Sequence, residues 1–78
     1  MLCSICGAPA KSLTPGDFDG FIVSCPHCHE YEVAGPAVNQ LLRLALSQRR
    51  EVLLRAKRQA PPGQRPIITN DSLNGQLP

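Results

Sequence analysis

Two short stretches of this sequence decide its fold, Cys3-Ser4-Ile5-Cys6-Gly7 and Cys25-Pro26-His27-Cys28-His29. Each contains a Cys-x-x-Cys pair, and this spacing places two sulfurs on the same side of one tight turn. Two such turns facing each other form the tetrahedron that Zn²⁺ prefers, with Zn–S distances of about 2.3 Å. The spacing therefore predicts one structural Zn²⁺, bound by all the cysteines of the chain, Cys3, Cys6, Cys25 and Cys28.

Other uses of the four cysteines are less well supported by the sequence. Iron in a four-sulfur site is the alternative metal, and disulfides or free thiols are the alternatives without one. A thioredoxin-like redox role requires a Cys-x-x-Cys pair beside a βαβ pattern, which the sequence lacks. Because four sulfurs already complete a tetrahedron, we expect His27 and His29 to be exposed knuckle residues rather than ligands.

The size of the chain makes a metal important for folding. Its 78 residues form one domain at most and include two phenylalanines, one tyrosine and no tryptophan. Burial of one large apolar side chain contributes about 1.5–3 kcal/mol, whereas ordering one backbone residue costs about 1–2 kcal/mol. The apolar side chains expected to form the core of residues 1–34 are Leu13, Phe21, Val23, Tyr31 and Val33. Structural zinc can add about 10–16 kcal/mol, enough to decide whether this half folds.

Strands are predicted on both sides of the second cysteine pair. Residues 21–24 are mostly β-branched or aromatic, and residues 31–33 alternate between apolar and polar side chains. Together they predict a hairpin over 21–33 that has the second cysteine turn at its tip. Residues 11–13 could add a short strand, and the intervening Pro- and Gly-rich residues 14–20 indicate a loop.

A helical region is expected from Pro36, which suits a first helical turn, to Ala60 before the Pro-Pro-Gly stop. In a single unbroken helix, Arg49 would lie in the centre of the apolar stripe and Leu54 on the polar side. A break near Ser47, which could cap a second helix, relieves part of this misfit. One long helix and two short ones therefore both remain open. The apolar stripe consists of Val38, Leu41, Leu42, Ala45, Val52, Leu53 and Ala56.

The cysteine stretches resemble those of the zinc-ribbon family over residues 1–34. In that family a glycine follows the second cysteine of each knuckle, because the turn requires a positive φ. The chain has Gly7 at the first such position but His29 at the second, and histidine tolerates left-handed backbone better than most residues. More distantly, the whole chain is similar to short bacterial or mobile-element proteins in which a C-P-x-C-x-x-Y-E ribbon precedes a helix. The resemblance implies fold and metal, and it leaves the partner open because zinc ribbons bind both nucleic acids and proteins.

Charge is distributed unevenly along the chain, whose formal net charge is +2. Residues 1–34 contain four acidic side chains and one basic side chain, whereas residues 35–78 contain seven basic and two acidic ones. The candidate contacts for nucleic acid or an acidic partner are Arg49, Arg50, Arg55, Lys57 and Arg58. A solvated basic face near a helix C-terminus, where cations complement the helix dipole, is the simpler interpretation. No aromatic residues are interleaved with these cations for base stacking.

The sequence thus predicts a small α+β protein with three parts. Residues 1–34 form a zinc ribbon of two knuckles and a short antiparallel sheet, residues 35–60 a helical segment packed on or beside it, and residues 61–78 an extended, partly disordered tail. Asp17 and Asp19 lie in a turn without a convergent partner, so we expect no enzyme. The expected function is a non-catalytic module that binds a protein, as a small regulator or inhibitor, or self-associates through the stripe. A nucleic-acid adaptor is the alternative.

The location is expected to be cytoplasmic. No signal peptide precedes Cys3, and the longest apolar-rich run, 41–46, is interrupted by Arg43 and too short to span a bilayer. In the cytosol thiols stay reduced, so that paired cysteines there bind metal more often than they form disulfides.

Overall fold

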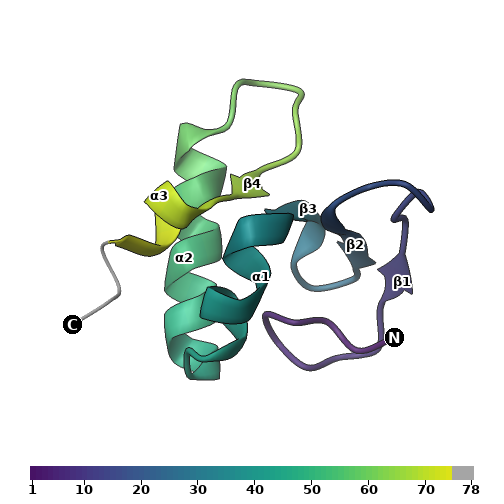
Figure 1. Cartoon of the computed structure of the whole chain (residues 1–78), viewed down its shortest axis with the longest axis horizontal. Helices are drawn as coiled ribbons and strands as arrows, with labels where there is room; N and C mark the ends of the chain where they lie inside the picture. Colours follow the sequence, from purple (N-terminus) through teal and green to yellow (C-terminus); the bar gives the residue numbers. More distant parts are fainter. Residues whose placement is uncertain (75–78) are drawn as a thin grey trace.

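The computed structural model describes residues 1–74, in which a four-stranded sheet is followed and covered by helices (Figure 1). This architecture confirms the α+β class. The elements in chain order are β1 (Lys11–Ser12), β2 (Gly20–Cys25), β3 (His29–Ala34), α1 (Gly35–Leu42), α2 (Leu46–Gln59), β4 (Ile67–Ile68) and α3 (Asn70–Asn74). Residues 75–78, the end of the predicted tail, lie outside the described part of the chain.

The β2–β3 hairpin is the centre of the sheet. Its antiparallel register pairs Phe21 with Val33, Val23 with Tyr31 and, at the tip, Cys25 with His29. The predicted hairpin with a cysteine turn at its tip is therefore confirmed. β1 pairs antiparallel with the other side of β2, as the sequence suggested for this segment.

The open end of the hairpin requires a glycine. Gly20 has a φ of +119°, a value that L-residues rarely adopt. A Cβ at this position would collide with the carbonyl oxygen of Val33 on the paired strand. Gly20 therefore allows β2 to begin directly against the end of β3, where the chain enters α1.

The helical region that follows β3 consists of two helices rather than one. α1 ends at Leu42 and α2 begins after Ala45, so the break lies slightly before Ser47, which is inside α2. The residue before α2 is Ala45, whose side chain cannot cap the helix, and its own N–H donates to the Gln48 side-chain oxygen at 3.0 Å. Within residues 1–74, no helix has the length and apolar character needed to cross a membrane.

The tail differs from the extended segment that the sequence predicts. Ile67 and Ile68 form β4, which pairs parallel with β3, and α3 follows it. A parallel neighbour requires a long crossover connection, and the two helices between β3 and β4 supply one. Arg65 anchors the approach to β4, because its guanidinium lies 3.4 Å from the Glu32 carboxylate and 3.7 Å from that of Glu30.

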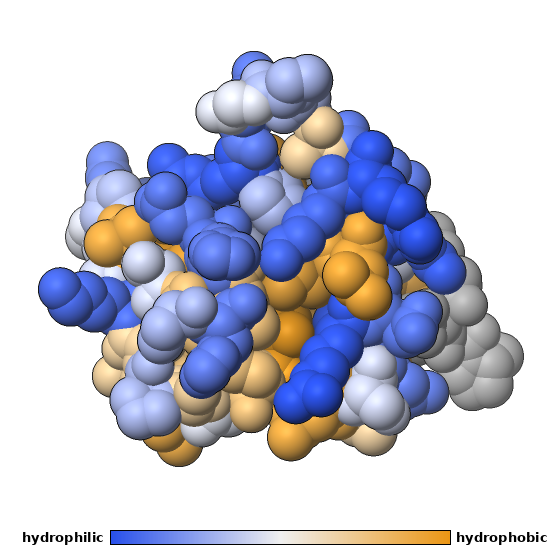
Figure 2. Space-filling model, turned by 180° about the vertical axis from the view of Figure 1, so that it is seen from behind, coloured by the Kyte–Doolittle hydropathy of each residue, from blue (hydrophilic) through white to orange (hydrophobic). Residues whose placement is uncertain are grey.

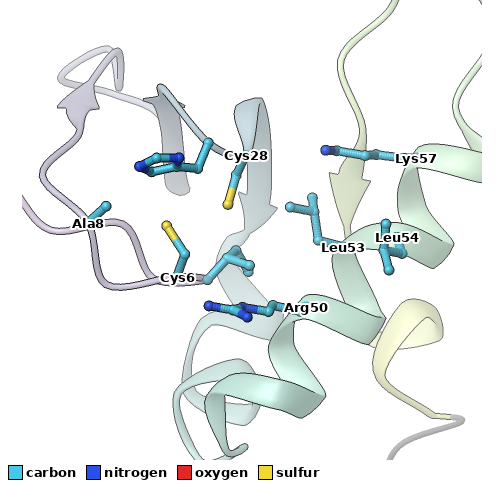
Figure 3. A pocket seen from close by; sticks show the side chains of 9 residues that line it. Cys6, Ala8, Cys28, Arg50, Leu53, Leu54 and Lys57 are labelled. Carbon is cyan, nitrogen blue, oxygen red and sulfur yellow. The ribbon is translucent and has the colours of Figure 1, made fainter.

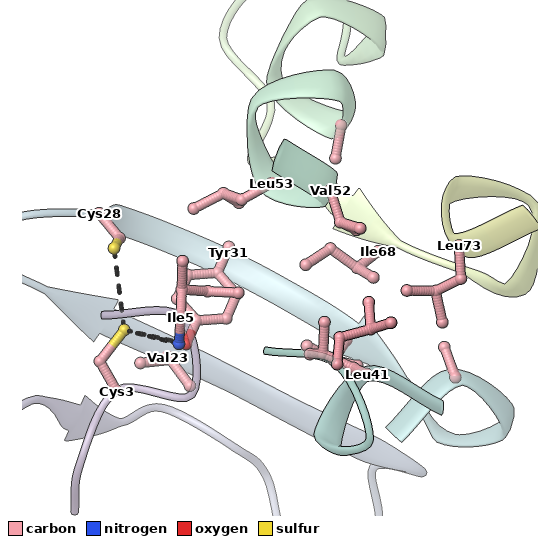
Figure 4. Close-up of a cluster of buried hydrophobic side chains, with 14 of the residues drawn as sticks. Cys3, Ile5, Val23, Cys28, Tyr31, Leu41, Val52, Leu53, Ile68 and Leu73 are labelled. Carbon is pink, nitrogen blue, oxygen red and sulfur yellow. Dashed lines mark hydrogen bonds between the residues drawn. The ribbon is translucent and has the colours of Figure 1, made fainter. Parts of the chain in front are cut away.

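One continuous core joins the sheet, the helices and the tail (Figure 4). Tyr31 of β3, Leu41 of α1 and Val52 of α2 are fully buried together with Ile68 and Leu73 from the tail. Of the side chains expected in the N-terminal core, Leu13 is the exception, since it is 42% exposed. It follows the two-residue edge strand β1, where the sheet has no further strand to cover it.

Candidate metal centre

The four cysteine sulfurs form one cluster, in which every pair of sulfur atoms lies within 4.8 Å. The Cys3 and Cys28 sulfurs are 3.8 Å apart, and those of Cys6 and Cys25 are 3.6 Å apart. A tetrahedral site with metal–sulfur distances of about 2.3 Å requires sulfurs about 3.8 Å apart. Both separations far exceed a disulfide bond of about 2.05 Å. The cluster thus has the dimensions of a four-sulfur metal site.

The two cysteine turns have matching backbone features. The Ile5 N–H donates to the Cys3 sulfur at 3.4 Å, and the His27 N–H donates to the Cys25 sulfur at the same distance. Gly7 and His29, which follow the second cysteine of each turn, have φ values of +80° and +66°. Both residues therefore have the expected positive φ, although the second is a histidine rather than a glycine.

Tyr31 joins the hairpin to the first cysteine turn. Its hydroxyl lies 3.3 Å from the Cys3 sulfur and accepts a hydrogen bond from the Ser4 N–H at 3.2 Å. Because the amide occupies an acceptor position of the hydroxyl, the hydroxyl proton can point to the sulfur. The sequence predicts Tyr31 only as a core residue. The alternation over 31–33 predicts that its side chain points inward, and this is the one feature of the sequence that could have indicated a contact with the sulfurs.

The cysteine thiols of this cluster differ in pKa. Burial acts to raise the pKa of Cys3, but the hydrogen bonds from Tyr31 and from the turn amides outweigh it and lower that pKa to about 6. Burial and the neighbouring cysteines raise the pKa of Cys28 well above its ordinary value. Four thiolates at this distance repel one another, so a bound cation is needed to keep all of them deprotonated.

The donor set is closed and made of one ligand type. Three of the cysteines are buried and Cys6 is half-buried, so the sulfur cluster is largely shielded from solvent. Soft thiolates in a tetrahedral arrangement suit zinc or iron. His27 and His29 are exposed, as predicted for residues outside the ligand set.

Arg49 differs from the other four candidate basic contacts. The Arg49 guanidinium donates to the backbone carbonyls of Leu42 at 2.8 Å, Leu44 at 3.0 Å and Ser4 at 3.0 Å. The half-buried Arg49 therefore connects the end of α1 and the helix connection to the first cysteine turn, and these hydrogen bonds account for its place in the apolar stripe. The others lie on the outside of α2, with Arg55 half-buried and Arg50, Lys57 and Arg58 exposed.

The structure thus brings the four predicted ligands together and separates Arg49 from the other cations. No protein-family model, curated protein or solved structure matches the chain. The cysteine cluster and the surface around it are the features that bear on what the protein does.

Proposed function

We propose that this protein is a zinc-stabilised module that acts by binding another protein rather than by catalysis. The observation that carries the proposal is the cluster of four cysteine sulfurs, all within 4.8 Å of one another. A metal bound there has sulfur in every tetrahedral position, which leaves no open position for a substrate. Such closed sites stabilise small folds, because metal binding and folding occur together.

Zinc is the metal that this site suits best. Closed four-cysteine sites of this size are the usual structural form of zinc in proteins. The paired turns with positive φ after the second cysteine, at Gly7 and His29, support a zinc-ribbon fold for residues 1–34. Iron is the alternative, and elemental analysis of the purified protein distinguishes the two metals directly.

A protein partner is favoured over nucleic acid by the exposed side chains. Leu42, Leu46 and Leu54 each expose about half of their surface, and such residues contribute to binding when they are transferred from water to a protein surface. None of the three aromatic side chains is fully exposed, because Tyr31 is buried and Phe18 and Phe21 are partly buried. The surface therefore lacks the stacking platforms that single-strand binders use.

Native mass spectrometry before and after a strong chelator tests the structural role of the metal. We expect one Zn²⁺ per chain, and loss of the compact charge states when it is removed. The same spectra report whether the chain self-associates. A metal-free protein that keeps its compact charge states would contradict the proposal.

A nucleic-acid adaptor is the second candidate, and it is favoured by the free cations of α2. Within residues 1–74, the only salt bridges are those of Arg65, so Arg50, Arg55, Lys57 and Arg58 have no carboxylate partner there. Binding through them would weaken steeply as salt is added, because phosphate contacts release counterions. Retention of an oligonucleotide that is unchanged in a variant with Arg50, Arg55 and Arg58 replaced by alanine would exclude this adaptor.

A further inference from the structure

A groove of about 570 Å³ lies between the cysteine turns and α2 (Figure 3). Its first wall contains Ala8 and the two cysteines Cys6 and Cys28, and its second wall is one face of α2. The molecular face opposite to the view of Figure 1 exposes apolar surface between strongly hydrophilic side chains (Figure 2). The groove is therefore formed by three segments that are far apart in sequence, within residues 5–8, 27–28 and 50–57, and only the tertiary fold brings them together.

The α2 wall has an apolar centre with a cation at each end. Arg50, Leu54 and Lys57 follow the i, i+4, i+7 spacing of one helix face, and all three line the groove. Leu53 lies beside them as the buried floor, whereas Leu54 is 53% exposed. This placement gives a reason for Leu54, which the sequence pattern puts on the polar side of the helix.

The charged side chains on the α2 wall of the groove are of one sign. The ionisable side chains of the groove other than cysteine are Arg50, Lys57 and His27, and no acidic residue lines it. Within residues 1–74, neither Arg50 nor Lys57 has a carboxylate at salt-bridge distance. A zinc ion with four thiolates carries net negative charge, but these sulfurs lie in the opposite wall. The two cations stand at the ends of long, exposed side chains that can turn outward.

We propose that this groove binds an acidic protein segment that inserts an apolar side chain over Leu53 and Leu54. Carboxylates on either side of that side chain would pair with Arg50 and Lys57. The inference rests on the proposed protein-binding function and names the surface and the partner chemistry. The exposed Leu54 favours a protein segment over a nucleic acid, because a protein segment can bury it with an apolar side chain. Phosphates could pair with the cations, but the sugar-phosphate backbone presents no apolar side chain to Leu53 and Leu54.

A displayed library of random short peptides, selected on the zinc-loaded protein, tests the proposal. We expect the selected peptides to be enriched in Asp and Glu around one or more large apolar residues. Their affinity, measured by fluorescence anisotropy, should fall by about tenfold or more in Leu54→Ser and in the double variant Arg50→Gln/Lys57→Gln, as for central interface residues.

Matched variants outside the groove control for general effects. Leu42→Ser removes a leucine of α1 that is 49% exposed, and Arg43→Gln/Arg58→Gln removes the same amount of charge at exposed positions. Peptide affinity should remain within about twofold in both, since surface changes away from an interface have small effects. Zinc content is measured in every variant, because a loss of zinc in Arg50→Gln/Lys57→Gln without weaker peptide binding would assign these cations to the metal centre and overturn the groove.

The remaining outcomes separate the groove from the proposed function. If acidic peptides bind the groove variants as tightly as the original protein, the groove is not the binding site, and the module binds proteins through another surface. Basic peptides, or no enriched peptides, would also overturn the proposed groove. A dimer of the free protein that Leu54→Ser dissociates would assign the groove to a second copy. If the chain holds no zinc or retains only oligonucleotides, the proposed function itself fails.

Discussion

Tyr31 shows how one side chain serves both the core and the metal centre. Its ring is fully buried in the core, while its hydroxyl reaches the Cys3 sulfur at 3.3 Å and the Ser4 amide at 3.2 Å. Groups that hydrogen-bond to metal ligands orient them and tune their affinity for the metal. The hydroxyl thus holds the first turn in register with the hairpin that carries the second.

The Tyr31→Phe variant removes this hydroxyl and keeps the ring. We expect its zinc affinity to fall by about 10–100-fold, in the range for outer partners of metal ligands, because Cys3 loses a donor and the Ser4 amide an acceptor. Competition with a chromophoric chelator measures the change. Zinc stoichiometry should stay the same, since all four cysteines remain, and an unchanged affinity would show that the hydroxyl does not support the site.

His29 occupies a backbone position that favours glycine. Its φ of +66° lies in the left-handed region, which costs roughly 1–2 kcal/mol for residues with a Cβ. His29→Val should therefore lower the free energy of unfolding by about 1–2 kcal/mol, because β-branched residues suit this region least. His29→Gly should stay within about 1 kcal/mol of the original, since relief of strain offsets the entropy lost by glycine. Denaturant titrations of the zinc-loaded proteins compare the two, and equal stabilities would contradict the expectation.

At the scale of elements, Arg49 connects three parts of the chain. It is the fourth residue of α2, and its guanidinium donates to the carbonyls of Leu42 at the end of α1, Leu44 in the helix connection and Ser4 in the first cysteine turn. The last carbonyls of a helix have no partner within the helix. Arg49 thus fixes the angle between α1 and α2 and ties both to the metal centre.

Replacement of Arg49 by alanine should lower the free energy of unfolding by about 2–3 kcal/mol, the range for losing hydrogen bonds to a charged group. Arg49→Lys should recover little of this loss, because one ammonium cannot reproduce the planar fork of the guanidinium. The neighbouring Arg50→Ala is the control, with an expected change within about 0.5 kcal/mol for an exposed residue. Thermal and denaturant unfolding measure all three, and equal effects at positions 49 and 50 would exclude the connector role.

The tail completes the core of the whole molecule. Ile68 and Leu73 are fully buried against the two helices and β3, and the Pro66 carbonyl accepts the Glu32 N–H at 2.9 Å. A small chain has little apolar surface to bury, so its last residues contribute to a core that the first 60 do not complete.

Substitutions of the two adjacent isoleucines of β4 test whether the tail contributes to the core. Ile68→Ala removes a fully buried side chain and should cost about 2–5 kcal/mol. Ile67→Ala changes a side chain that is 48% exposed, and it should cost much less, within about 0.5–1 kcal/mol. Chemical denaturation of the zinc-loaded proteins gives both values. A similar cost at the two positions would mean that the tail is not part of the cooperative fold.

The features that depend on local spacing can be predicted from the sequence. Two Cys-x-x-Cys pairs identify the four cysteines that cluster, a β-branched run and an alternating run identify the hairpin, and Gly7 indicates a turn with positive φ. Each of these follows from residues a few positions apart, whose geometry the backbone fixes directly.

The features that depend on contacts between distant segments cannot be predicted in this way. Arg49 is one of five candidate cations in the sequence, but its hydrogen bonds to the carbonyls of Ser4 and Leu42 make it a connector between segments. The tail is predicted to be extended, and its two β-prone isoleucines do not reveal from the sequence that their strand pairs with β3. The groove requires the first cysteine turn and α2 to lie side by side. Short-range patterns cannot specify such contacts, because their energy comes from burial and pairing between segments that the chain brings together only on folding.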